Sequence, residues 1–142
     1  MKKLFTITLF CLLTYALMAD IMSTTYGGNW MNASTWIGGV VPNLNSNVII
    51  QGPVYVNTTN ECLNLTVLGG GTITNPYNEI GQVTVYANCT NYGQIVDGGP
   101  DGEVRLVVLG NILTTNTITC EYVYYAGDTD HTFANVGTFN PT

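Results

Sequence analysis

Three carboxylates lie close together in the segment DGGPDGE, which begins at Asp97. Asp97, Asp101 and Glu103 would present hard oxygen ligands on a glycine-rich turn, and calcium prefers such oxygens in proteins. The segment lacks the spacing of acidic residues found in an EF-hand loop. We therefore treat these three residues as candidate calcium ligands, with a plain solvated turn as the alternative, and we expect no other cofactor.

The two tryptophans, Trp30 and Trp36, lie close together in the N-terminal third of the chain. An exposed indole face can stack on a sugar ring. A buried ring would instead help to fill the first layer of a core, since an aromatic side chain buries roughly 150–250 Å². Trp30 and Trp36 are thus either capping residues or carbohydrate-stacking residues, and the sequence leaves both roles open.

Groups suited to acid–base catalysis are few. Beyond Lys3, Arg105 is the only lysine or arginine, and His131 is the only histidine, between acids in residues 128–131. Polysaccharide cleavage needs a pair of acid/base groups in a fixed arrangement. We expect no catalytic residue and no enzyme activity. A single arginine against nine acidic residues also argues against nucleic acid, because clustered basic side chains supply most of that affinity.

The N-terminus, MKKLFTITLFCLLTYALMAD, has the layout of a secretory signal peptide. Two lysines precede an apolar run over residues 4–18, and the small residue Ala19 follows, as in cleavable export signals. The run is shorter than the roughly 20 residues of a membrane-spanning helix. We expect residues 1–19 to be removed and the mature chain, without a transmembrane segment, to be secreted or held at the cell surface.

Beyond this region no window sustains apolar residues at helical spacing. Val, Ile, Thr and Tyr, which favour strands, form short alternating runs between turns rich in Asn and Gly. Hydrophobic residues make up 46% of the chain, a composition unlike that of a disordered protein. The candidate strands are residues 48–50, 54–56, 63–68, 72–74, 82–86, 94–96, 104–109, 116–120 and 122–125.

Two internal shifts align parts of this region. A shift of 18 places LTVLGGGTI, from Leu65, on VTVYANCTN, from Val83, and a shift of 23 places VYANCTNYGQI, from Val85, on VLGNILTTNTI, from Val108. A period of about 20 residues suits one coil of a β-solenoid. Corner asparagines are then expected to stack along the axis. The residues expected to point inward are Leu65, Val67, Val83, Val85, Leu106 and Val108.

We predict an all-β fold, a parallel β-helix (β-solenoid), with an N-terminal cap over residues 20–46 and repeats over residues 47–142. The alternative is an antiparallel β-sandwich, whose short strands recur at similar spacing. The solenoid is preferred because the dipeptides that favour two-residue hairpins, Asn-Gly and Asp-Gly, are scarce. Only Asp97-Gly98 and Asp101-Gly102 occur, both in one loop.

Three cysteines follow the signal peptide: Cys62, Cys89 and Cys120. An odd number in an oxidising compartment leaves at least one thiol without a partner in the chain. Their wide spacing excludes CxxC chemistry and the close ligand pairs of common zinc sites. We expect buried thiols, with one disulfide as the alternative.

Residues 27–74 also carry four motifs in order: G-x-W, T-W-x-G-G-x-x-P, V-x-I-x-G-x-V-x-V and L-x-V-x-x-G-G-T. On these motifs the chain resembles the N-terminal region of secreted or cell-surface right-handed parallel β-helix repeat proteins of Bacteroidetes-like bacteria, and more distantly the G8 module. The resemblance implies a fragment of a longer protein, with further β-helix repeats after Thr142, and carries over no catalytic residue. The matching residues are Gly28 and Trp30; Thr35, Trp36, Gly38, Gly39 and Pro42; Val48, Ile50, Gly52, Val54 and Val56; and Leu65, Val67, Gly70, Gly71 and Thr72.

The sequence therefore predicts a non-catalytic structural or adhesive β-solenoid segment of a secreted or cell-surface bacterial protein. Its expected partner is an extracellular glycan or a surface protein. One alternative is a carbohydrate-binding module that stacks sugars on Trp30 or Trp36. The other is part of a polysaccharide-active β-helix enzyme.

Overall fold

The computed structural model describes residues 20–76, 78–99, 101–120, 122–125 and 133–135. The predicted signal peptide, residues 1–19, and residues 128–131 lie outside these ranges. Within them the chain forms short strands and one 3-10 helix, η1 (Ala33–Thr35). The strands are β1 (Asp20–Met22), β2 (Gly28–Asn29), β3 (Asn47–Ile50), β4 (Pro53–Tyr55), β5 (Thr59–Cys62), β6 (Asn64–Val67), β7 (Thr72–Thr74), β8 (Ile80–Val85), β9 (Cys89–Asn91), β10 (Gln94–Val96), β11 (Glu103–Val108), β12 (Ile112–Thr114), β13 (Thr117–Thr119), β14 (Tyr122–Tyr125) and β15 (Phe133–Asn135).

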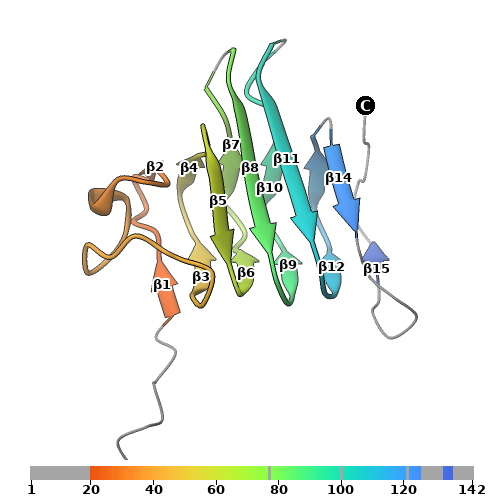
Figure 1. Cartoon of the computed structure of the whole chain (residues 1–142), viewed down its shortest axis with the longest axis horizontal. Helices are drawn as coiled ribbons and strands as arrows, with labels where there is room; N and C mark the ends of the chain where they lie inside the picture. Colours follow the sequence, from red (N-terminus) through yellow and green to blue (C-terminus); the bar gives the residue numbers. More distant parts are fainter. Residues whose placement is uncertain (1–19, 77, 100, 121, 126–132, 136–142) are drawn as a thin grey trace, which may run out of the picture.

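These strands form three parallel sheets that the chain visits in turn, one strand at a time. The six-stranded sheet has the order β1-β3-β6-β9-β12-β15, the five-stranded sheet β13-β10-β7-β4-β2 and the four-stranded sheet β14-β11-β8-β5. Successive coils therefore stack side by side, as Figure 1 shows for β5, β8, β11 and β14. The predicted β-solenoid is confirmed, and the antiparallel sandwich is wrong because every pairing between these strands is parallel.

Aliphatic rows fill the space between the sheets. The residues predicted to point inward, such as Leu65 and Leu106, are at most 1% exposed. Rows form because residues in register share the same side of a sheet, so that Val83 lies against Leu106 and Val85 against Val108. Each fully buried aliphatic side chain contributes about 1.5–3 kcal/mol. These rows are the main source of stability that the fold offers.

The strand register confirms the 23-residue shift but not the 18-residue shift. Val85 pairs with Val108, as the 23-residue shift requires. Leu65 lies in β6 of the six-stranded sheet and pairs with Cys89, whereas Val83 lies in β8 of the four-stranded sheet. The 18-residue shift therefore aligns strands that occupy different places in the coil. Their sequences are similar because both strands alternate aliphatic and polar residues against the same core.

Corner asparagines stack along one edge of the six-stranded sheet, as predicted. Each side-chain amide donates to the carbonyl oxygen of the preceding one: Asn64 to Asn47 at 2.9 Å, Asn88 to Asn64 at 3.2 Å and Asn111 to Asn88 at 2.8 Å. Asn47 donates in turn to the carboxylate of Asp20 at 3.3 Å. This row of hydrogen bonds links successive coils at their outer surface, because each asparagine amide donates to the side chain in the preceding coil.

Residues 20–46 contain both a partial coil and a cap. Strands β1 and β2 extend the six- and five-stranded sheets by pairing with β3 and β4. The chain then leaves the coil through η1, whose N-terminus is capped by Asn32 Oδ1, which accepts a hydrogen bond from Ser34 N at 3.1 Å. The four-stranded sheet consequently begins only at β5, beyond the cap.

Candidate functional site

Trp30 and Trp36 pack together inside the cap. The two side chains are 1% and 2% exposed. Their rings meet edge to face, with centroids 5.1 Å apart and planes at 75°, an arrangement that aromatic pairs favour. Trp36 Nε1 donates to Trp30 O at 2.7 Å. Because the ring faces are covered, a sugar could stack on either tryptophan only if the cap opened.

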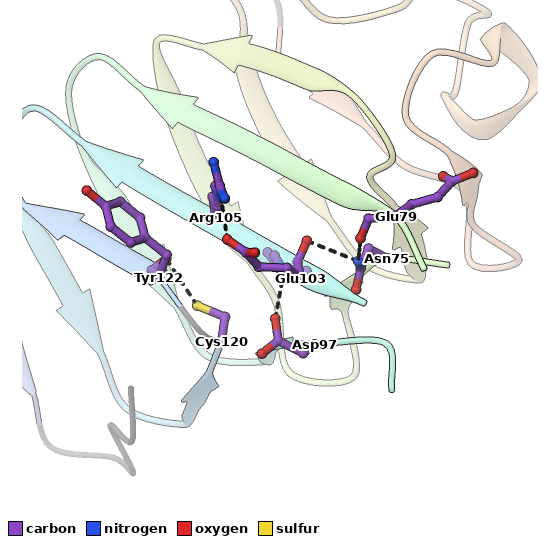
Figure 2. Close-up of polar contacts among 8 residues, drawn as sticks. Asn75, Glu79, Asp97, Glu103, Arg105, Cys120 and Tyr122 are labelled. Atoms are coloured by element: carbon purple, nitrogen blue, oxygen red, sulfur yellow. Dashed lines mark hydrogen bonds and ion pairs between the residues drawn. The ribbon is translucent and has the colours of Figure 1, made fainter. Parts of the chain in front are cut away.

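Two of the three candidate calcium ligands, Asp97 and Glu103, contact different partners (Figure 2). Asp97 Oδ1 accepts a hydrogen bond from Val104 N at 2.6 Å, and Glu103 forms an ion pair with Arg105. Asp101 is exposed on the turn. Within the described part of the chain, no group of three or more His, Cys, Asp or Glu side chains is arranged to hold a metal ion.

Asn75, in the preceding coil, fastens this acidic loop. Its Nδ2 donates to Glu103 O at 3.0 Å and to Glu79 O, while its Oδ1 accepts from Gly98 N at 2.7 Å. Figure 2 shows Asn75 beside the start of β11, where it meets the backbone of Glu103. The hydrogen bonds from Asn75 thus hold the loop by its backbone. The carboxylates of Asp97 and Glu103 instead contact Val104 N and Arg105.

The three cysteines are buried and unpaired with one another. Burial raises the pKa of Cys62, and it raises the pKa values of Cys89 and Cys120 to about 12. The cause is the loss of hydration, which penalises the charged thiolate. Thiols held neutral in this way are poor nucleophiles, so these cysteines contribute to packing in the core.

The outer side of the four-stranded sheet gathers aromatic and polar side chains from four coils. We call it the tyrosine face. Its inward-facing neighbours, such as Val83 and Leu106, are fully buried, so the alternate residues point outward. The tyrosine face consists of Thr59, Glu61, Gln82, Thr84, Tyr86, Glu103, Arg105, Val107, Tyr122 and Tyr124.

Its most exposed rings belong to Tyr122 and Tyr124 on β14. They are 47% and 48% exposed, and their planes lie within 5° of each other, with centroids 6.5 Å apart. Tyr86 OH donates to Glu61 Oε1 at 2.9 Å, and this hydrogen bond to a carboxylate raises the pKa of the phenol. Arg105 lies in register with Tyr122. The face therefore offers apolar rings with hydrogen-bonding groups close by.

This grouping was not predicted from the sequence, although the alternation of Tyr122 and Tyr124 about Val123 was a usable signal. Two residues apart on a strand, they must share one side of the sheet. Glu61 and Tyr86, by contrast, lie on β5 and after β8, and only the register of the coils brings them together.

Comparisons with family models, with curated proteins and with solved structures give no match. Among the described residues, no helix is long and apolar enough to cross a membrane.

Proposed function

We propose that this chain is a non-catalytic structural or adhesive β-solenoid segment of an exported protein, and that its tyrosine face adheres to an extracellular glycan. The observation that carries this proposal is the pair formed by Tyr122 and Tyr124. These are two half-exposed rings, nearly parallel, on one strand of a sheet that spans several coils.

The chemistry of the face suits a neutral or weakly basic glycan. The apolar face of a sugar ring packs on aromatic side chains, and its hydroxyls hydrogen-bond to polar groups. Arg105 lies on β11, the strand beside these tyrosines, and Gln82 and Glu61 follow on the next two strands of the sheet, β8 and β5. A sheet also holds such side chains at fixed intervals of about 4.8 Å between strands, which suits a repeating polymer.

Export is the second half of the proposal. It rests on the predicted signal peptide over residues 1–19, and the resemblance to secreted or cell-surface β-helix proteins supports it. The continuous interior rows suit a stalk, since each coil is stabilised by its neighbours. Further repeats of the same kind would extend both the stalk and the face.

The proposal is tested by presenting the full chain to an array of immobilised extracellular polysaccharides. We expect binding to at least one of them. The double variant Tyr122→Ser/Tyr124→Ser should weaken this binding at least about tenfold, the equivalent of about 1.4 kcal/mol.

The matched control removes two exposed tyrosines from elsewhere, Tyr26→Ser/Tyr55→Ser, whose side chains are 92% and 41% exposed. Circular dichroism would verify that both double variants keep the fold. Equal loss of binding in the two variants, or no binding by the parent chain, would exclude the tyrosine face as the adhesive surface.

A carbohydrate-active enzyme is the competing class. Incubating any bound polysaccharide with the full chain, with and without calcium, should release no new reducing ends. If products are released and substitution of Glu61 or Glu103 stops the release, the function of the tyrosine face is cleavage and not adhesion.

A further inference from the structure

The first coil of the solenoid does not contribute to the four-stranded sheet. The second to fifth coils each contribute one strand to every sheet, whereas the first coil consists of β1 and β2. The four-stranded sheet begins at β5 in the second coil, and Figure 1 shows β5 at the cap end of that sheet. In the part of the chain that the structure describes, the place beside β5 that a strand of the first coil would occupy is therefore without a strand.

The cap contacts the other two sheets at this end of the solenoid. Beside β1, Ile37 N donates to Met22 O at 2.8 Å, and beside β2, Thr35 Oγ1 donates to Asn29 O at 2.7 Å. Among the described residues, no hydrogen bond from the cap reaches residues 59–62 of β5. Proteins usually cover a free strand edge, because its unpaired backbone groups attract other strands. The edge of β5 is the exception at this end.

The backbone groups of Thr59 and Glu61 face this free edge. The carbonyl oxygens of Thr58 and Cys62 accept hydrogen bonds from the next coil at 2.9 and 3.0 Å, so these two residues direct their backbone groups toward β8. Successive residues of a strand direct their backbone groups to opposite sides. Thr59 and Glu61 alternate with Thr58 and Cys62, and they therefore present their N–H and C=O groups to the edge beside the cap.

A groove of about 220 Å³ runs along the same edge, between β5 and the cap. Trp30 and Asn60 form its floor and are 1% and 3% exposed, so the floor is closed to a ligand. Met31 and Leu44 form the rim on the cap side and are 57% and 47% exposed. A bound segment would therefore contact the backbone edge of β5 on one side and two apolar side chains on the other.

The chemistry of the groove fits an extended peptide with a basic residue. Asn43 Nδ2 and the hydroxyl of Thr59 can donate hydrogen bonds, and Glu61 is the charged residue in the lining. A peptide backbone has donors and acceptors in alternation, and a Lys or Arg side chain complements Glu61 in charge. A second copy of this chain is a poor source of that residue. Beyond Lys3 its only lysine or arginine is Arg105, which forms an ion pair within β11.

We propose that β5 accepts a short, extended, basic peptide from another protein, which adds a strand to the four-stranded sheet in the place that the first coil leaves empty. The N–H and C=O groups of Thr59 and Glu61 pair with the peptide backbone. A basic side chain of the peptide lies against Glu61, and its apolar side chains contact Met31 and Leu44. Addition of a strand to a free sheet edge is a recurring mode of peptide recognition. This interaction does not depend on the glycan adhesion proposed for the tyrosine face.

The test is a fluorescence-anisotropy titration of the full chain against a labelled peptide of sequence Val-Thr-Val-Lys-Val-Thr. We expect saturable binding. Two N-methylated peptides, each modified at one alternate set of nitrogens, test the backbone pairing, because only one set faces β5. Methylation of that set should weaken binding at least about tenfold more than methylation of the other. Exchange of the lysine for glutamate should also weaken binding at least about tenfold.

Variants of the chain test the position of the peptide. Leu44→Arg places a bulky cation on the rim and should weaken binding at least about tenfold. The control Val40→Arg adds the same charge at a cap residue that is 57% exposed and does not line the groove. The control should keep the affinity within about twofold. Thr59→Pro removes an N–H that faces the groove and spares the hydrogen bonds to β8, so it should weaken binding as well, with circular dichroism to verify the fold. Leu44→Arg decides the matter if Thr59→Pro does not fold.

The proposal is overturned if the peptide does not bind saturably, if the two methylated peptides or the glutamate peptide bind as well as the parent peptide, or if Leu44→Arg binds as well as the parent chain. A dimer of the chain that Leu44→Arg dissociates in sedimentation would assign the groove to a second copy and would also overturn it. Leu44→Arg should keep polysaccharide binding, and Tyr122→Ser/Tyr124→Ser should keep peptide binding, so the groove and the tyrosine face fail separately.

Discussion

Single polar residues inside the coils are held by specific hydrogen bonds. Asn91 and Thr114 are 0% exposed and lie in register on β9 and β12. Asn91 Nδ2 donates to Thr114 Oγ1 at 3.2 Å and to Thr117 O at 3.1 Å, and its Oδ1 accepts from Gly93 N at 3.1 Å. These bonds fix the corner between the six- and five-stranded sheets, since a shift of one residue would leave them unmade.

Replacing Asn91 by alanine should therefore be strongly destabilising. The change leaves Gly93 N and Thr117 O without this partner in a buried corner, and each unpaired group costs about 1–3 kcal/mol. We expect Asn91→Ala to lower the free energy of unfolding by about 2–4 kcal/mol in urea titrations. Asn116→Ala, at an exposed residue with similar side-chain bonds, should cost less than about 1 kcal/mol. Equal costs would contradict the importance of the buried corner.

The three core thiols predict how stability depends on pH. The folded chain raises the pKa values of Cys89 and Cys120 from 9.0 to about 12 and raises that of Cys62 as well. The folded state thus keeps protons that the unfolded state loses above pH 9. The stability contributed by the three thiols is fully present below pH 9. Above pH 9 the free energy of unfolding falls as the pH rises towards and through the folded pKa values, by up to about 1.4 kcal/mol per pH unit for each thiol.

Urea titrations between pH 7 and 11 would measure this loss. The triple variant Cys62→Ala/Cys89→Ala/Cys120→Ala should show a shallower decline above pH 9, although its stability at pH 7 is lower because methyl groups replace larger buried side chains. A native chain that reacts with iodoacetamide at pH 8 as fast as the unfolded chain would contradict buried, protonated thiols.

At the scale of elements, the turns between strands must let one coil approach the next. A Cβ added to Gly110 would lie 1.9 Å from Ala87 O of the preceding coil, far inside van der Waals contact. Gly69 occupies a comparable turn, but its nearest atom, Tyr92 O, would be 3.9 Å away. Close stacking of the coils, more than backbone conformation, is what requires glycine at position 110.

The two glycines form a matched pair for a mutation experiment. Gly110→Ala should destabilise the chain by about 1–3 kcal/mol, because the coil must shift to admit the methyl group. Gly69→Ala should change the free energy of unfolding by less than about 0.5 kcal/mol. Thermal or urea unfolding of the two variants would measure this difference. Equal effects of the two substitutions would contradict the close approach of Gly110 to Ala87 O.

Strand prediction succeeded where aliphatic residues alternate with polar ones. Residues 72–74, 94–96 and 122–125 are strands with the predicted bounds. Six strands were missed: β1, β2, β5, β9, β12 and β15. In β5, β9 and β12 the inward residues include the polar residues Asn60, Asn91 and Thr114, where the pattern expects aliphatic ones. Polar residues can occupy these positions because neighbouring coils supply hydrogen bonds, and that information is absent from any single strand.

The tyrosine face could not be predicted from the sequence, for a related reason. From β8 to β11 the register advances by 23 residues, as the internal repeat indicates, so Val83 pairs with Leu106. The next step is shorter, since Leu106 pairs with Val123. Because loops of different length join the coils, a fixed period could not align Tyr122 with Arg105, although it did identify the interior rows.

At the scale of the whole molecule, each proposal depends on coils that stack in parallel and in register. The outer row of the six-stranded sheet runs through residues 22, 49, 66, 90 and 113, which pair in turn. Four steps of about 4.8 Å separate the backbones of Met22 and Leu113 by about 19 Å. Met22 and Leu113 are far apart in sequence, so they lie at this distance only if the coils stack in the order and register given above.

The most direct measurement is therefore a distance between spin labels on the double variant Met22→Cys/Leu113→Cys. The thiols of Cys62, Cys89 and Cys120 are buried and should not take the label under native conditions, and Cys11 is replaced by serine in the labelled chain. We predict a single narrow distribution centred near 20 Å, with the flexible arms of the labels adding a few ångströms to the backbone value of about 19 Å. A broad distribution, or one centred beyond about 30 Å, would contradict the stacked coils and with them the tyrosine face.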